Sequence, residues 1–268
     1  MKDPFITYII ATYNCIDRID VLKSTVLSLD GLPVEFIVSD GGSEDGTLEM
    51  LRGISNIIIA CSSRDEGIYD AWNKAIPMAK GKYFGFIGVD DIPQKDFVIE
   101  AMRKDSRSSS GIALMYGDVR LLRKNRYREI KSPTHPQLLL SEAPFLDIPH
   151  QGALHASSLF EKHVFEKKFK IAGDLHFLLK MRQLAMISSY VKLSTLQAVV
   201  DEDGVSRSET AWFVLLKEYR MIEEDLKIKI GYSRAKTTLL SSFRHVPWLF
   251  MAIKNTAWIF RGKRIVKM

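Results

Sequence analysis

The first third of the chain alternates between apolar runs and helical patterns. Four runs rich in β-branched and aromatic residues are predicted strands, over residues 5–11, 34–39, 56–61 and 83–89. Helices are predicted between them, over residues 16–29, 48–51 and 68–79. Strands that alternate with short helices predict right-handed βαβ units, and therefore an α/β fold with a mostly parallel sheet flanked by helices.

The pattern changes after Pro93. A helix is predicted at 95–103, followed by two strands at 113–122 and 127–130 and by another strand within 151–160. A second helix is expected at 173–184, and a strand or extended chain at 187–200. From Ser208 the sequence is helical in character to the end, which predicts a C-terminal helical appendage to the α/β domain.

Each of the four predicted strands in the first part ends in a polar cluster. The clusters are Thr12-Tyr13-Asn14, Asp40-Gly41-Gly42-Ser43, Arg64-Asp65-Glu66-Gly67 and Asp90-Asp91. Open α/β sheets bind ligands at the carboxyl ends of their strands, and helix starts there offer N–H groups to phosphate. Any one cluster is also an ordinary turn, and neither common glycine-rich nucleotide motif is present. Four clusters along one sheet edge nevertheless indicate a nucleotide site.

The pair Asp90-Asp91 follows the most apolar of these strands. Adjacent carboxylates repel each other, and a divalent cation with its phosphates is a natural compensation. On this pair alone, caps for the helix that begins near Lys95 explain the residues equally well.

Composition narrows the class of protein. The 268 residues are 46% hydrophobic and 26% charged, which suits one large α/β domain with or without an appendage. The net charge of +6 is compatible with nucleic acid, an anionic membrane surface or a phosphorylated substrate. Cys15 and Cys61 form no disulfide or metal pattern, which favours a reducing compartment. No signal peptide or spanning segment is recognised, so we expect a cytoplasmic protein, or one attached to a membrane from that side.

The four clusters and their surroundings resemble the inverting glycosyltransferases of family 2, which have the GT-A fold. The motifs are ATYN at 11–14, VSDGGSEDGT at 38–47, DEGIYDAWNKA at 65–75 and VDD at 89–91. Their order and spacing cover the first half, and the resemblance continues more thinly through 150–151 and 172–174. It implies a GT-A catalytic domain at 1–206, with a nucleotide-sugar-binding half at 1–93 and an acceptor half at 94–206. Residues 207–268 would form a basic, amphipathic helical region.

The resemblance implies roles for the first two clusters. Tyr13 would lie against the nucleobase, and Asp40 would accept a hydrogen bond from the imide N–H of the base. Thr12 and Ser43 would help to hold base or ribose. The neighbouring Asn14 and Gly42 complete this predicted donor-binding set.

The resemblance also assigns the third and fourth clusters. Asp65, with the helix that follows Gly67, would shape the sugar and ribose pocket. Asn73 and Lys74 would project from that helix, with Lys74 either reaching a phosphate or lying in solvent. Asp90 would face ribose or metal, and Asp91 would ligate Mg²⁺ or Mn²⁺ on the diphosphate.

By resemblance, Asp174 is the catalytic base that takes the proton of the acceptor hydroxyl. Considered alone, this residue is also a reasonable helix cap. Many relatives carry a second acid and an aromatic residue after this aspartate, where the present chain has Leu175 and His176. His150 and His155 are either diphosphate or metal contacts or structural histidines. The loop 201–206 resembles one that folds over the donor phosphates.

Basic and apolar residues interleave from Tyr232 onward, and acidic residues disappear. Basic helices with tryptophans such as Trp248 and Trp258 suit an anionic membrane surface, where a lipid-linked acceptor would present its sugar. The alternative is a helical pair that packs on the catalytic domain or on a second subunit.

These features predict a metal-dependent, inverting glycosyltransferase of cell-surface polysaccharide biosynthesis, with a hexosyl or N-acetylhexosaminyl donor carried by UDP. The acceptor would be a glycan or a lipid-linked saccharide. One alternative is a sugar nucleotidyltransferase, although residues 12–18 lack the glycine-rich basic loop of that class. Another is a nucleotide-sugar-binding protein without activity, against which the intact aspartates argue. Nucleic acid is not an expected partner, because no recognised motif accompanies the positive charge.

Overall fold

The computed structural model describes residues 3–123, 126–130, 132, 148–201, 211–228 and 230. The predicted loop over the donor phosphates, beyond Asp201, and the basic tail beyond Tyr232 lie outside these residues. No helix within the described ranges is both long and apolar enough to cross a membrane.

Four parallel strands form one side of the sheet, in the order β3-β2-β1-β4. They are β1 (Ile6–Thr12), β2 (Val34–Asp40), β3 (Ile57–Ser62) and β4 (Tyr83–Ile87). The connecting helices are α1 (Ile19–Ser28), α2 (Thr47–Arg52) and α3 (Ile68–Ala75). Thr12 pairs with Asp40 in the register of β1 and β2, so the polar clusters that end these strands meet at one edge.

The second half of the chain continues the same sheet through β8-β6-β9-β5. The short β8 (Ala153–Ala156) runs antiparallel to both β4 and β6 (Leu114–Arg123), and β9 (Tyr190–Asp201) runs parallel to β6. The two-residue β5 (Ile92–Pro93) pairs with the end of β9, and β7 (Arg126–Ile130) pairs with β6. The expected mostly parallel α/β sheet is confirmed.

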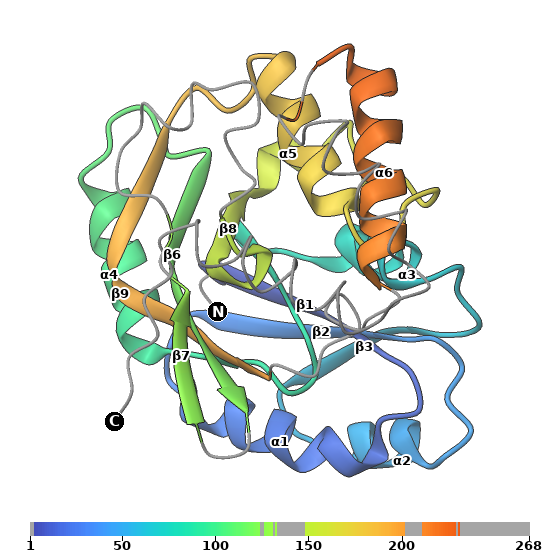
Figure 1. The fold of residues 1–268 in the computed structure, drawn as a ribbon. Coiled ribbons are helices and arrows are strands. Elements are labelled where there is room, and N and C mark those ends of the chain that lie inside the picture. Colours follow the sequence, from blue (N-terminus) through green and yellow to red (C-terminus); the bar gives the residue numbers. More distant parts are fainter. Residues whose placement is uncertain are drawn as a thin grey trace.

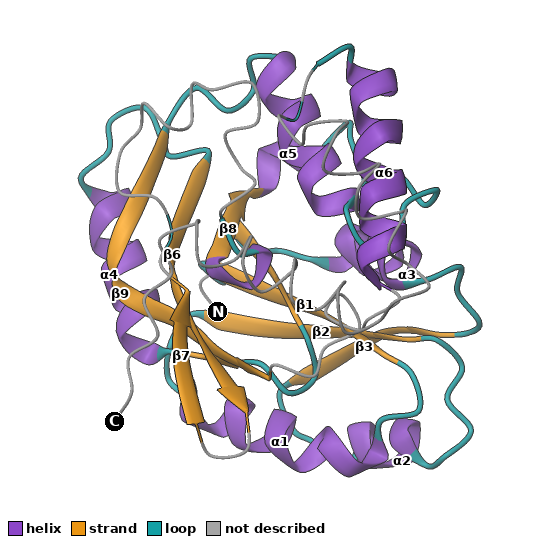
Figure 2. Cartoon of the chain, viewed as in Figure 1, coloured by secondary structure: helices purple, strands orange, loops and turns teal. Residues whose placement is uncertain are grey.

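Helices cover both faces of the sheet (Figures 1 and 2). On one face lie α1 and α2, while α3, α5 (Gly173–Gln183) and α6 (Ala211–Leu226) gather on the other. Helix α4 (Lys95–Ser106) packs beside β9. Single turns of 3-10 helix are η1 (Ile16–Arg18), η2 (Ile76–Met78), η4 (His150–Gly152) and η5 (Ser157–Phe160).

Successive side chains along the strands point to opposite faces of the sheet and contribute to two hydrophobic cores. Tyr8 and Ile10 of β1 face the core under α1 and α4, whereas Ile9 and Phe86 face the core under α3 and α5. Because both of their faces are buried, β1 and β4 are mostly continuous apolar runs rather than alternating ones. Helix α6 belongs to the second core, into which it inserts Ile222 and Leu226.

Two predicted elements differ from the structure in extent. The helix expected at 68–79 ends as α at Ala75 and continues as the 3-10 turn η2, because Pro77 lacks the N–H that an α-helix needs there. The strand expected within 151–160 is only β8, with a 3-10 turn on each side.

Candidate active site

The ends of β1 and β2 meet around the buried carboxylate of Asp40. One of its oxygens accepts hydrogen bonds from the hydroxyls of Thr12 (3.0 Å) and Ser43 (2.6 Å). The other accepts from the Ser62 hydroxyl and from the backbone N–H groups of Gly42 and Ser43, at 2.9–3.1 Å. Burial by itself would raise the pKa of Asp40, but these bonds outweigh it, so the pKa lies below its ordinary value. Its predicted contact with a base imide would have to compete with five bonds already made.

Asn14 ties the two clusters together from the β1 side. Its N–H donates to the Ser43 hydroxyl (2.8 Å), and its side-chain oxygen accepts from the Glu44 N–H (2.9 Å). Asn14 has φ of +42°, a left-handed conformation that asparagine tolerates better than most residues.

The backbone at Gly41 passes close to the side chains of Tyr13 and Asp65. A Cβ at position 41 would come within 2.6 Å of an Asp65 oxygen and 3.3 Å of the Tyr13 ring. Only glycine avoids both contacts, so Gly41 lets these two side chains lie beside the turn after β2. Tyr13 is 66% exposed, which leaves its ring available to a flat ligand. Gly42, at φ of +83°, turns the backbone so that it passes beside Arg64.

Helix α3 begins at Gly67 and carries two further predicted donor contacts. Both amide atoms of Asn73 are used by the backbone of Phe165, which donates at 3.0 Å and accepts at 2.8 Å. The ammonium of Lys74 donates to the Arg64 carbonyl (3.0 Å) and pairs with Asp70 (3.2 Å). In this structure both side chains therefore hold protein segments together.

Asp90 and Asp91 stand at the turn between β4 and β5. An Asp91 oxygen accepts from the Gly88 N–H (2.6 Å) and the residue is 3% exposed, while Asp90 pairs with Arg18 (3.3 Å). A Cβ at Gly88 would lie 3.1 Å from an Asp90 oxygen and 3.2 Å from an Asp91 oxygen, so glycine keeps a space between both carboxylates. Among the described residues, no three His, Cys, Asp or Glu side chains converge on a metal position. One or two carboxylates with phosphate oxygens and water suit Mg²⁺, so the pair fits the expected cation.

Asp174 occupies the first turn of α5, as the sequence predicts. Its side chain is 25% exposed, and one oxygen lies 3.1 Å from the hydroxyl of Tyr69, a residue of α3. Burial raises the pKa of Asp174 to about 6, against the opposing effect of hydrogen bonds from the Leu175 N–H and the Tyr69 hydroxyl. A carboxylate of this pKa is ionised at neutral pH and readily accepts a proton, which suits a general base.

The two histidines have different surroundings. His155 is fully buried on β8, with Nδ1 3.4 Å from the Phe84 carbonyl, as expected of a structural residue. His150 is 9% exposed, stacks on Phe86 and places Nδ1 3.7 Å from an Asp174 oxygen. Burial lowers the pKa of each to about 3, so both rings are neutral at physiological pH.

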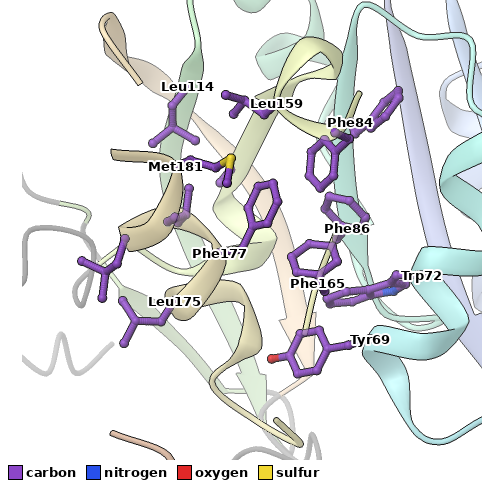
Figure 3. Packing of buried hydrophobic residues seen from close by; sticks show 14 of the residues in the cluster. Tyr69, Trp72, Phe84, Phe86, Leu114, Leu159, Phe165, Leu175, Phe177 and Met181 are labelled. Atoms are coloured by element: carbon purple, nitrogen blue, oxygen red, sulfur yellow. The ribbon is translucent and has the colours of Figure 1, made fainter. Parts of the chain in front are cut away.

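The segment before Asp174 is held from two sides. Glu218 of α6 is buried and accepts from the N–H groups of Lys170 (2.5 Å), Ile171 (3.0 Å) and Ala172 (2.8 Å). On the other side, the Tyr69 hydroxyl lies 2.7 Å from the Ile171 carbonyl. Figure 3 shows Tyr69 extending from α3 toward α5, within a cluster that includes Trp72, Phe165 and Phe177.

The sequence predicted one sheet edge for all of the polar clusters, and the structure joins Thr12, Asn14, Asp40 and Ser43 there by hydrogen bonds. The sequence missed several partners of these and the other site residues. Arg18 and Glu218 were not singled out, and Tyr69 was named only as part of a motif. The sequence contains a partial signal for Tyr69. In DEGIYDA its aromatic hydroxyl lies between the acids Glu66 and Asp70, at the start of a predicted helix. No local signal marks Glu218, because its partners lie almost 50 residues away.

Comparison with known proteins identifies a family for this chain. The model of glycosyl transferase family 2 matches residues 7–167. A PGL/p-HBAD biosynthesis glycosyltransferase of Mycobacterium bovis is 24% identical over 182 residues, which cover 66% of this chain and 69% of that protein. The Escherichia coli UDP-Glc:alpha-D-GlcNAc-diphosphoundecaprenol beta-1,3-glucosyltransferase WfaP is 34% identical over 88 residues, or 32% of this chain and 35% of that one.

Solved structures share the fold. S. aureus TarS 1-349 in complex with UDP-GlcNAc superimposes with a TM-score of 0.61 at 17% identity, over 81% of this chain and 65% of that structure. The present chain thus spans slightly less than two thirds of it. Glucosyl-3-phosphoglycerate synthase from Mycobacterium tuberculosis, in complex with Mn²⁺, UDP and product, gives 0.55 at 17% identity, over 80% and 79%. With the family model matching more than half of its length, the chain belongs to glycosyl transferase family 2.

Proposed function

We propose that this glycosyltransferase moves a hexosyl or N-acetylhexosaminyl group from a UDP-sugar to a hydroxyl of a glycan or lipid-linked saccharide, with inversion and with a divalent cation. The donor is supported by WfaP, whose name specifies UDP-Glc, and by TarS, which was crystallised with UDP-GlcNAc. The acceptor class is supported by the diphosphoundecaprenol in the name of WfaP, and the cation by the Mn²⁺ in the synthase structure.

The observation that carries the proposal is the state of Asp174. Its pKa of about 6 keeps it charged at neutral pH yet close to the value at which it can take a proton. It lies against α3, the helix that begins in the predicted donor pocket. Carboxylates with raised pKa values are common at catalytic sites, which favours an enzyme over a scaffold that only binds a nucleotide sugar.

In the proposed reaction the donor sits at the carboxyl ends of β1, β2 and β4. Tyr13, whose ring is largely exposed, and Asp65, which lies beside Gly41, would contact the base and ribose. Asp91, with Asp90 beside it, would hold the cation, which when bound neutralises charge on the diphosphate. Asp174 orients the acceptor hydroxyl and takes its proton as the oxygen attacks the anomeric carbon from the face opposite UDP.

The cellular setting follows from the acceptor. A lipid-linked saccharide is presented at a membrane surface, so we place the enzyme on the cytoplasmic face, in cell-surface polysaccharide biosynthesis. Within the C-terminal region 207–268, the basic part beyond Tyr232 is the proposed contact with anionic lipid. Loss of binding to anionic vesicles on removal of residues beyond Tyr232 would support this contact, and equal sedimentation of both forms would exclude it.

Thermal unfolding with a panel of UDP- and GDP-sugars, with and without Mg²⁺ or Mn²⁺, tests the donor. A bound donor raises the apparent melting temperature by mass action, so a UDP-sugar with cation should give the largest rise. Asp91→Asn should abolish the cation-dependent part, whereas Asp105→Asn, at the opposite end of β4, should retain it. Stabilisation by none of the nucleotides, or stabilisation that is unchanged in Asp91→Asn, would contradict the proposal. Release of pyrophosphate from UTP and a sugar phosphate would instead indicate the nucleotidyltransferase.

A further inference from the structure

A set of contacts joins the motif at 65–75, which was expected to line the donor pocket, to the segment that leads to Asp174. Asn73 pairs with the backbone of Phe165, and Lys167 pairs with Glu66 at 2.7 Å and with Asp70 at 3.4 Å. Lys170 donates to the Glu66 carbonyl. The motif therefore fixes the approach to the catalytic residue, over a sequence separation of about 100 residues.

Tyr69 is the member of this set that reaches Asp174 itself. Its hydroxyl lies 2.7 Å from the Ile171 carbonyl and 3.1 Å from an Asp174 oxygen. The ring can come so close only because residue 173 is glycine, since a Cβ there would lie 2.7 Å from the Tyr69 ring. Tyrosine offers one hydrogen to these two acceptors.

We infer that Tyr69 is a positioning residue for the proposed base, Asp174, and that its hydroxyl hydrogen shifts between two acceptors during the reaction. While Asp174 is ionised, the hydrogen points to the carboxylate, because a charged acceptor makes the stronger bond. Once Asp174 has taken the acceptor proton, the hydrogen turns to the Ile171 carbonyl, so no buried donor loses its partner. The inference rests on the proposed role of Asp174.

The backbone around this switch is fixed. Glu218 holds the N–H of Ile171, whose carbonyl faces Tyr69, so the second acceptor does not move. Among the described residues, His150 of η4 also faces Asp174, with Nδ1 3.7 Å from one of its oxygens. Its pKa of about 3 keeps it neutral wherever Asp174 titrates. Removal of the Tyr69 hydroxyl should therefore affect two acceptors, Asp174 and the Ile171 carbonyl, and of these only Asp174 titrates.

The test is a ¹³C-carboxyl NMR titration of the full chain, in which Asp174→Asn identifies the Asp174 signal. In Tyr69→Phe the aromatic packing remains and the hydroxyl is lost, so we expect the pKa of Asp174 to rise by about 0.5–1 unit. With the best UDP-sugar, kcat should fall about 10-fold and its acid limb should move upward, with donor KM unchanged. Tyr83→Phe removes a comparable bond, to Asp105 at 2.7 Å, and should change none of these values.

An Asp174 pKa that is the same in Tyr69→Phe and wild type would overturn the inference, as would a loss of activity accompanied only by lower stability. If Tyr69→Phe proves unstable, Gly173→Ala keeps the hydroxyl and displaces the ring, and should raise the same pKa. Failure of the proposed function has a different signature. Asp174→Asn would then retain transfer, whereas the pKa shift in Tyr69→Phe would still appear.

Discussion

The surroundings of Asp40, at the carboxyl end of β2, and of Asp174, in the first turn of α5, shift the pKa values of the two carboxyl groups in opposite directions. Asp40 accepts five hydrogen bonds and its pKa lies below the ordinary value, whereas burial raises the pKa of Asp174 to about 6. Carboxylates whose environments push their pKa values apart commonly have different tasks. The charged carboxylate of Asp40 holds the ends of neighbouring strands and the turn after β2 together. The pKa of Asp174 lies close enough to neutral pH for this residue to gain a proton readily.

The same contrast separates the two halves of the site. Around Asp40 the donors belong to β1, β3 and the turn after β2, so the anchor is assembled within the predicted donor half. Asp174 depends on Tyr69 from the donor half, on His150, and on Glu218 of α6, which holds the preceding segment. The proposed base therefore lies where the predicted halves and α6 meet.

The largest effect should follow from Asp174→Asn. Loss of a general base typically lowers the rate about 100- to 10,000-fold, and we expect a fall in kcat within that range. Donor binding by calorimetry should be unchanged, because the amide fills the same space and can still accept from Tyr69. Transfer at an undiminished rate would show that the base is another group and would remove the functional difference between the two aspartates.

Asp40→Asn should damage the fold rather than the chemistry. An amide nitrogen would face hydroxyl and N–H donors that now bond to a carboxylate, and a buried donor without a partner costs about 1–3 kcal/mol. We expect a loss of about 2–4 kcal/mol in the free energy of unfolding, measured in urea.

Asp45→Asn is the matched control for that change. Asp45 lies in the same turn and accepts three bonds, from Ile16 and Thr47, but it is exposed, so water can replace them. Its loss of stability should be clearly smaller. Equal losses in the two variants would mean that burial does not distinguish the Asp40 site.

Much of the fold could be predicted from local patterns. The continuous apolar runs of β1, β2 and β4, each followed by polar turn residues, predict strands buried on both faces, as the structure shows. The run of β3 also forms a strand, at the partly exposed edge of the sheet. The two-residue β5 could not be predicted, because it exists only through its pairing with Val199, about 100 residues later. Pro77 is a local reason for α3 to end at Ala75. The prediction of a helix to residue 79 followed the apolar spacing and did not take this proline into account.

The site was predictable to a similar degree. The position of Asp174 at the start of a helix could be predicted because helix starts have local signals. Thr12 and Asp40 could be placed at one sheet edge because neighbouring parallel strands end together. The partner of a polar side chain is not local, and Asn73 illustrates this. On a helix beside a donor pocket it was expected to bind ligand, but both of its amide atoms pair with the backbone of Phe165. Its predicted donor contact stays a prediction.

The smallest expected effect is on the free energy of unfolding, which should be lowered when the partly buried Asp174 is ionised. Its folded pKa of about 6 lies above the ordinary value of about 3.9, so the folded state binds this proton more tightly than the unfolded chain. The corresponding stability is present below pH 4 and is lost as pH rises through 6. Asparagine cannot ionise, so Asp174→Asn should be more stable than wild type by about 1–2 kcal/mol at pH 8, after allowance for partial exposure.

The measurement is the difference in free energy of unfolding between Asp174→Asn and wild type, followed in urea from pH 4 to pH 8. It should be near zero at the acid end and grow through pH 6, because the other titrating groups are common to both chains and cancel. Asp105→Asn, which removes a carboxylate already paired with Lys82 and Tyr83, should show no such gain. A difference that does not vary with pH would mean that Asp174 is ionised without cost, and the contrast with Asp40 would then rest on hydrogen-bond count alone.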